Sequence, residues 1–352
     1  MRIEKKNELT KISTAKTFMM LCVVLYHSCL AYIGDNWGNF TSDYTSQYVR
    51  VFCLWLNTFH IQTFTFASGY LFYMGRYEKG KYRNGIADII HRAKRLLVPY
   101  IVISLIWAFP IKSLFYGFSW QSLVRDFILA IAPAQLWFLP MLFLLYIVFY
   151  FGCDLFLKTD KFAVILFGVF LIQLFIGKII PLGVFQISNT VMFSIYYWMG
   201  IVFRRETTRE IEGILHKWIK TPIWKQFLIN IILYLLYYWG CYKSENIVFH
   251  ILAEAILPFI GCLGVLLIIT IFFRLSINFK NKIYRICAVN SMGIYLLHEQ
   301  ILYFLIRIFA DFPENIYVRI LLNFLLAMTI SLGLSIVIRS SHLGRIILGE
   351  EN

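Results

Sequence analysis

The chain has 352 residues, of which 60% are hydrophobic, 18% are aromatic and only 15% are charged, and its mean hydropathy is +0.70. Soluble domains carry about 45–50% apolar and about 25% charged residues, so this composition excludes a soluble enzyme, a disordered chain and a disulfide-rich scaffold. The formal net charge of +14 is typical either of a nucleic-acid-binding protein or of a membrane protein with basic inner loops.

Ten stretches are apolar over roughly the 20 residues that a membrane-spanning helix needs. In chain order they cover residues 14–34, 50–74, 95–116, 136–153, 162–180, 189–203, 225–242, 247–273, 287–309 and 317–338. A further segment, 119–132, is amphipathic and is expected to lie at the membrane interface. Since the chain shows no internal repeat and no soluble appendage, we expect residues 1–352 to form one all-α domain, a polytopic bundle of about ten spans.

The N-terminus and the cysteines each allow a second interpretation. A basic start followed by an apolar run is similar to a signal peptide, but the run is long and no small-residue cleavage site follows Leu30. We therefore expect an uncleaved first span. The seven cysteines form no CxxC pair and mostly lie in apolar runs, so they are expected to be core thiols rather than metal ligands or disulfides.

The distribution of basic residues predicts the topology. If residue 1 lies in the cytoplasm, the inner segments contain 26 of the 33 Lys and Arg residues. Cytoplasmic loops of membrane proteins carry such an excess, so the count predicts an even number of spans and cytoplasmic termini. Because topology then accounts for most of the positive charge, no nucleic-acid binding is expected.

Ionisable residues inside spans are costly and mark function by default. The first is His27, which lies eleven residues after Lys16. At about 100° per residue the two share one helix face, roughly 16 Å apart, with Lys16 at the cytoplasmic mouth and His27 near mid-membrane. The alternative is a snorkelling lysine and a histidine hydrogen-bonded between helices.

Two more spans place a histidine at a similar depth, His60 in the second and His298 in the ninth, where Glu299 follows it. Three histidines at one level indicate a shared polar cavity. Ser68 and Gly69 would let a ligand approach the backbone closely, although small residues commonly serve helix packing alone. A further acid, Glu254, lies in the outer part of the eighth span.

Few reactions suit such a cavity. A neutral imidazole can take a proton from a hydroxyl near neutral pH, and a nearby carboxylate can orient it. The sequence shows no GxSxG, no nucleophilic Cys–His pattern and no HExxH or comparable metal-ligand spacing. Direct transfer assisted by a histidine base, without a metal, is therefore expected.

The loop before the third span contains Arg92 and Arg95, whose spacing places them on one face of a helix. Arginine binds phosphates in a bidentate geometry, so a phosphate-rich cytosolic donor could use this pair. The alternative is an anchor that contacts anionic lipid.

These features, in this order, resemble the acyltransferase-3 family of bacterial integral-membrane O-acyltransferases over essentially the whole chain. The family motif of a basic residue, ten positions and a histidine is matched by Lys16 and His27. Residues 59–72, FHIQTFTFASGYLF, are similar to the fucose 4-O-acetylase-like branch, with Gln62 where proline is usual. Further matches are the R-x-x-R loop at Arg92 and Arg95, LWFL at 136–139 and SMGIYLLH at 291–298.

The resemblance implies an acyl donor, typically acetyl-CoA, that enters from the cytoplasm of a bacterial plasma membrane. It also implies a sugar hydroxyl of a surface glycan or a lipid-linked precursor as acceptor. By the same resemblance His27 is the base, and Lys16, Arg92 and Arg95 hold CoA. The residues expected to line the transfer cavity are His60, Ser68, Gly69, Trp137 and His298, together with Glu254.

A transporter of a glycan or a small acid is the main rival, since ten spans with polar groups at the midplane also suit a carrier. The sequence contains none of the broken inverted repeats that would favour one. A purely structural partner or sensor is a third reading, and it does not explain the three histidines.

Overall fold

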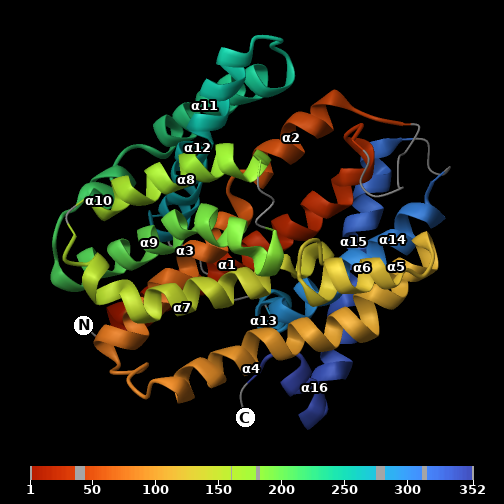
Figure 1. Ribbon diagram of the computed structural model, residues 1–352, viewed down its shortest axis with the longest axis horizontal. Helices are drawn as coiled ribbons and strands as arrows, with labels where there is room; N and C mark the ends of the chain where they lie inside the picture. The colour runs from red at the N-terminus through yellow and green to blue at the C-terminus, as the bar shows by residue number, and fades with distance from the viewer. Residues whose placement is uncertain are drawn as a thin grey trace.

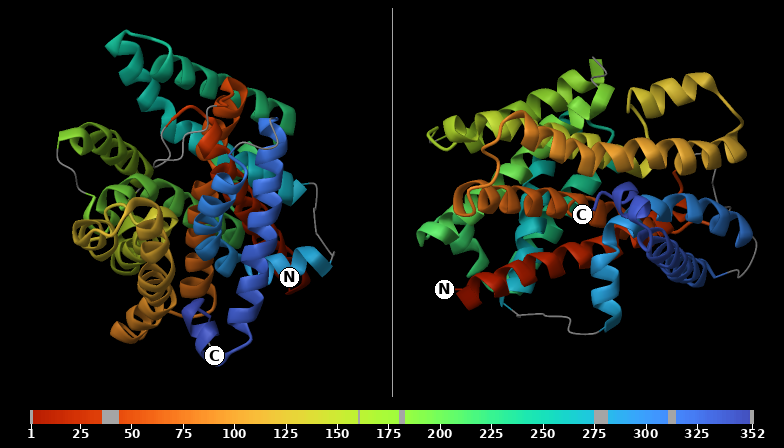
Figure 2. Two further views of the ribbon diagram at one scale, coloured as in Figure 1. Left: turned by 90° about the vertical axis from the view of Figure 1, so that its right-hand side faces the viewer. Right: turned by 90° about the horizontal axis from the view of Figure 1, so that it is seen from below.

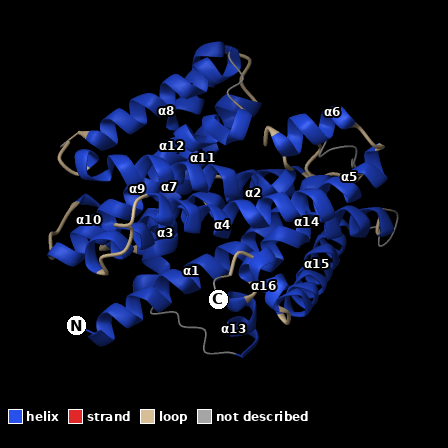
Figure 3. Ribbon diagram, turned by 60° about the horizontal axis from the view of Figure 1, so that its bottom comes forward, coloured by secondary structure: helices blue, strands red, loops and turns tan. Residues whose placement is uncertain are grey.

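The computed structural model describes residues 2–35, 44–159, 161–179, 183–274, 282–310 and 315–350. Over these ranges the chain forms helices and no strand, which confirms the all-α prediction (Figure 3). All seven cysteines lie in these ranges, and each is a free thiol.

Helix α1 (Arg2–Cys29) forms the centre of the bundle and continues into a 3₁₀ turn, Leu30–Tyr32. It packs against α3, α12 (Ile247–Arg274), α14 (Ser291–Ile308) and α15 (Ile316–Arg339). In both views of Figure 2, α1 (red) lies close to α15 (blue), whereas α7 (Phe138–Phe156) lies farther from it. Because α1 has neighbours on several sides, many of its apolar residues, such as Met19 and Val24, are fully buried.

The second predicted span is not one continuous helix. It divides into α2 (Gln47–Asn57) and α3 (His60–Tyr73) at Thr58 and Phe59. Phe59 leaves the helical region, with φ −142° and ψ −12°, and its side chain fits against Gly264 of α12, where a Cβ atom would lie 2.6 Å away. The break puts His60 at the first position of α3.

The remaining predicted spans coincide with helices (Figure 1). They are α4 (Ile86–Ile103) with α5 (Phe109–Tyr116), α7, α8 (Phe162–Ile179), α9 (Ile187–Arg209), α11 (Ile223–Tyr242), α12, α13 (Lys282–Val289) with α14, and α15. Shorter helices are α6 (Trp120–Ser122), α10 (Ile214–Ile219) and α16 (His342–Ile347). Among the described residues, 5 helical segments are long and apolar enough to cross a membrane: Glu8–Tyr32, Ile86–Tyr116, Ala134–Phe156, Ile247–Arg274 and Ile316–Arg339. The count of ten spans stays a prediction.

Segments expected on one side of the membrane contact one another. At one end of the bundle Arg204, 2% exposed, joins Glu8 and Glu78 through ion pairs of 2.5 Å. At the opposite end Arg50 pairs with Asp35 at 2.6 Å. These contacts join segments that the charge count placed on one side, and the orientation in the membrane stays a prediction.

Candidate functional site

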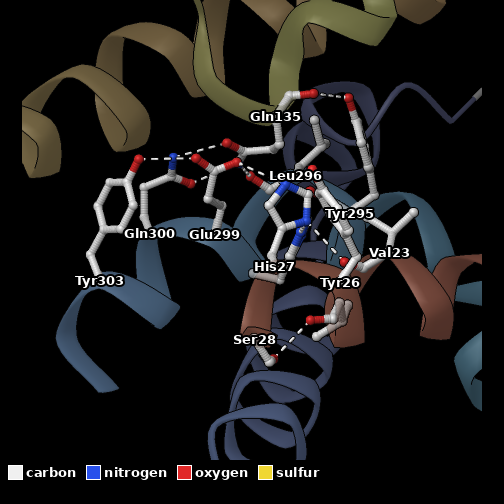
Figure 4. A network of polar contacts seen from close by, with 12 residues as sticks. Val23, Tyr26, His27, Ser28, Gln135, Tyr295, Leu296, Glu299, Gln300 and Tyr303 are labelled. Carbon is white, nitrogen blue, oxygen red and sulfur yellow. Dashed lines mark hydrogen bonds and ion pairs between the residues drawn. The ribbon is translucent and has the colours of Figure 1, made fainter. Parts of the chain in front are cut away.

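The site centres on two histidines from different helices, His27 near the end of α1 and His298 within α14. Figure 4 shows His27 and the polar residues around it. The Nδ1 atom of His27 lies 3.2 Å from Nε2 of His298, and their ring centroids are 4.9 Å apart. On the other edge of the ring, Nε2 of His27 lies 3.5 Å from a carboxylate oxygen of Glu299. The structure thus brings His27 and His298, which the sequence places at a similar depth, within hydrogen-bonding distance.

Backbone carbonyl groups of the preceding helical turn orient both rings. Nδ1 of His27 lies 2.9 Å from the Val23 oxygen, and Nδ1 of His298 lies 2.8 Å from the Tyr295 oxygen. A carbonyl oxygen only accepts hydrogen bonds, so Nδ1 carries the hydrogen in each neutral ring. Nε2 of His298 then accepts from His27, and Nε2 of His27 is left as the basic nitrogen.

Glu299 supplies a negative charge beside this basic nitrogen. Its side chain is 5% exposed, and its other carboxylate oxygen accepts a hydrogen bond of 2.9 Å from the Tyr303 hydroxyl. The 3.5 Å separation from His27 exceeds the ~2.7–2.9 Å of a direct charge-assisted hydrogen bond. The carboxylate can therefore stabilise a protonated ring by charge while Nε2 keeps room for a reacting hydroxyl.

His60 contacts this pair through an intervening ring. Its centroid lies 4.9 Å from that of Tyr26, which in turn lies 5.1 Å from that of His27. Its Nδ1 atom donates 2.8 Å to the Leu56 oxygen across the break between α2 and α3. His60 and His298 are 1% and 0% exposed, whereas the His27 side chain is 14% exposed. Of the three, His27 is the one that a substrate can reach.

A pair of amide side chains, which the sequence analysis did not single out, holds α14 against the turn before α7. Gln135 and Gln300 exchange hydrogen bonds of 2.7 and 3.0 Å, and Gln135 also donates 2.9 Å to the Leu296 oxygen. The Tyr295 hydroxyl donates to the backbone oxygen of Gln135. The signal was available, because Glu299 and Gln300 directly follow His298 and are polar residues within an apolar run.

A cavity of about 680 Å³ lies on the α1 face that leads toward the histidines. Its lining includes Lys16, Ser68, Arg92 and Arg95, which come from three helices distant in sequence, α1, α3 and α4. Tyr295 also lines it, and its ring lies 6.3 Å from the ring of His298. The cavity therefore extends from a group of three cations to the wall of the histidine cluster.

The cavity keeps a positive charge. Arg339, which also lines it, is neutralised by both carboxylate oxygens of Glu350 at 2.7 and 2.8 Å. The Arg92 guanidinium lies 5.3 Å from the centroid of the Tyr146 ring, and its buried Nε atom has no hydrogen-bond partner in the described part of the chain. Such a cluster suits a ligand that carries phosphate groups.

Five of the residues expected to line the cavity do not line it. Three of them lie away from it, and two lie behind its wall. Gly69 packs against α9, where a Cβ atom would lie 1.9 Å from the Tyr197 oxygen. Trp137 packs against Phe193, with centroids 5.4 Å apart. Glu254 pairs with His250 at 3.2 Å, outside the lining. His60 and His298 approach the cavity without lining it, whereas Ser68 lines it as expected.

No group of three or more His, Cys, Asp or Glu residues that could hold a metal ion occurs in the described ranges. A family model described as an acyltransferase domain matches residues 9–340, a range that contains the histidine cluster and the three cations of the cavity. No curated protein and no solved structure matches the chain significantly.

Proposed function

The chain belongs to the acyltransferase-3 family, and from this we propose that it moves an acetyl group from acetyl-CoA to a hydroxyl group of a cell-surface sugar. The observation that carries the proposal is the cavity that leads from Lys16, Arg92 and Arg95 to the wall of the His27–His298 pair. Such an arrangement joins an anion-binding end to a base.

The donor enters from the cytoplasm with its phosphate groups at Lys16, Arg92 and Arg95. The eleven residues from Lys16 to His27 rise roughly 16 Å along α1, at about 1.5 Å per residue. The pantetheine arm of CoA spans such a distance, so the thioester reaches His27 while the charged nucleotide stays at the mouth.

His27 acts as general base. Its Nε2 atom takes the proton of the sugar hydroxyl as the oxygen attacks the thioester carbonyl carbon, and Glu299 stabilises the resulting imidazolium. His298 accepts from Nδ1 and so keeps Nε2 as the reacting nitrogen. Collapse of the tetrahedral intermediate breaks the carbon–sulfur bond, and the CoA thiolate recovers the proton from His27. The ester carbon–oxygen bond is thus formed in the attack, and the carbon–sulfur bond is broken in the collapse.

The acceptor is a sugar of a surface polysaccharide or of its lipid-linked precursor, and it approaches His27 from the end opposite to the cations. Residues 59–72 support a fucose 4-O-acetylase-like member of a bacterial plasma membrane with both termini in the cytoplasm. A transporter is not favoured, because the family match is to an acyltransferase domain.

The test uses purified protein, acetyl-labelled acetyl-CoA and fucose-containing glycans. The wild type transfers label to sugar, and His27→Ala abolishes the transfer while inserting and folding normally. His342→Ala, an exposed histidine at the start of α16, is the matched control and keeps full activity. Full transfer by His27→Ala would overturn the mechanism, and a wild type that moves sugar without labelling it would favour the transporter.

A further inference from the structure

A second cavity, of about 440 Å³, adjoins the first at the start of α4. Its lining consists of three tyrosines, two arginines, one glycine and one aspartate: Arg76, Tyr77, Tyr82, Arg83, Gly85, Tyr150 and Asp154. None of these residues has a part in the transfer chemistry proposed above. Its walls come from the segment that follows α3, from the loop before α4 and from α7. Helices α4 and α7 pack against each other (Figure 1).

Tyr82 forms the boundary between the two cavities, because its side chain lines both. Its backbone has a positive φ of 61°, which is uncommon for a residue other than glycine. Its ring stacks on Phe72, with centroids 5.7 Å and planes 7° apart, and fills the space above Gly75. Tertiary packing therefore fixes this boundary.

Arg76 and Asp154 neutralise each other within the second cavity. They form an ion pair of 2.6 Å, and Arg76 also donates 2.6 Å to the Tyr150 oxygen. The Arg76 guanidinium lies 5.6 and 5.5 Å from the ring centroids of Tyr77 and Tyr150. Burial and the hydrogen bond to Asp154 raise the pKa of Tyr77, so its hydroxyl stays a donor.

Arg83 gives the second cavity its net positive charge. It is exposed and has no hydrogen-bond or ion-pair partner among the described residues. The cavity thus combines aromatic walls with one guanidinium group. Aromatic side chains bind the faces of nucleobases, and arginine binds phosphate. A volume of this size lies within the range of about 300–1,000 Å³ that small-molecule pockets have.

We propose that this second cavity binds the adenosine 3′-phosphate end of CoA, with the base against the tyrosine rings and the 3′-phosphate on Arg83. The inference rests on the proposed function, which places the pyrophosphate at Lys16, Arg92 and Arg95 in the first cavity. Along CoA, the nucleoside is followed by the pyrophosphate, the pantetheine arm and the thioester. The sites follow in the same order, from Arg83 past Tyr82 to His27.

The experiment compares binding of CoA and of 3′-dephospho-CoA to the purified full chain in nanodiscs. The wild type binds CoA more tightly. Arg83→Gln weakens CoA binding about tenfold and leaves 3′-dephospho-CoA binding unchanged, because it removes one charge-assisted contact. Lys81→Gln, an exposed cation two residues away that does not line the cavity, is the matched control and changes neither affinity.

Other binding results would contradict the assignment of CoA to the two cavities. If the wild type binds both compounds equally, or if Arg83→Gln weakens both by the same factor, the assignment of the 3′-phosphate to this cavity is overturned. If anionic phosphatidylglycerol displaces adenosine 3′,5′-bisphosphate from the wild type but not from Arg83→Gln, the cavity binds a lipid headgroup instead. A wild type that binds no CoA at all overturns the proposed function as well.

Discussion

His27 and Glu299 face each other where α1 meets α14, with Nε2 of the imidazole 3.5 Å from the carboxylate. Each side chain has a second partner on its far edge, His298 for the imidazole and Tyr303 for the carboxylate. The four side chains form a row in which Glu299 stabilises a proton gained at Nε2 of His27, and His298 accepts a hydrogen bond from the proton that stays on Nδ1. This arrangement defines the nitrogen that we propose as the base.

Glu299→Gln should lower kcat about 100-fold, a typical contribution of general-base catalysis, with little change in the KM for acetyl-CoA. The amide keeps the shape of the side chain and a hydrogen-bond acceptor for Tyr303, but it removes the charge that stabilises protonated His27. Steady-state kinetics measure both constants. Glu245→Gln, on an exposed loop, is the control, and a rise in KM without a fall in kcat would contradict this role for Glu299.

The Gln135–Gln300 pair should stabilise the contact between α14 and the turn before α7. Gln135→Leu leaves the Gln300 amide buried and unpaired, which costs about 1–3 kcal/mol, seen as a lower thermal midpoint in detergent. Because Gln135→Leu/Gln300→Leu removes both partners, the double variant should lose less than the sum of the single losses. Strictly additive losses would show that the two amides do not interact.

Much of the fold was predictable, since every predicted apolar stretch overlaps a helix. The break at Thr58 and Phe59 was not, because the chain carries no proline or glycine there. A tertiary contact decides it: Phe59 occupies the space that Gly264 of α12 leaves open. Hydropathy describes one helix at a time and carries no information about that neighbour.

The site was predictable in its residue types and only partly in its positions. The spacing of Lys16 and His27 and the Arg92–Arg95 pair followed from helix geometry, and the cavity lining contains all of these except His27. Ser68 and Gly69 show which positions the sequence could not predict. Neighbouring helix positions lie about 100° apart, so one can line a cavity while the next packs against α9, and the sequence does not say which.

Arg92→Gln should raise the KM for acetyl-CoA about tenfold with a smaller effect on kcat, because it removes a charge-assisted contact to phosphate at the mouth of the cavity. Lys16→Gln should act in the same direction. Lys94→Gln is a matched control, since this exposed lysine is on the same helix but does not line the cavity. An equal rise in KM for Lys94→Gln would indicate a general surface charge effect rather than a phosphate site.

Gly69→Ala should destabilise the protein through packing rather than chemistry. The added Cβ atom would lie 1.9 Å from the Tyr197 oxygen, and a Cβ atom added at Gly200 of α9 would lie 2.0 Å from the Phe66 oxygen. The two helices leave no room for a side chain at this contact, so α3 and α9 can accommodate one only by separating. Overpacking costs about 1–3 kcal/mol, which a thermal melt in detergent measures. Gly168→Ala on α8 meets nothing within 4 Å and should leave the melting midpoint unchanged. If Gly69→Ala melted like the wild type and raised only the KM for the donor, Gly69 would belong to the cavity after all.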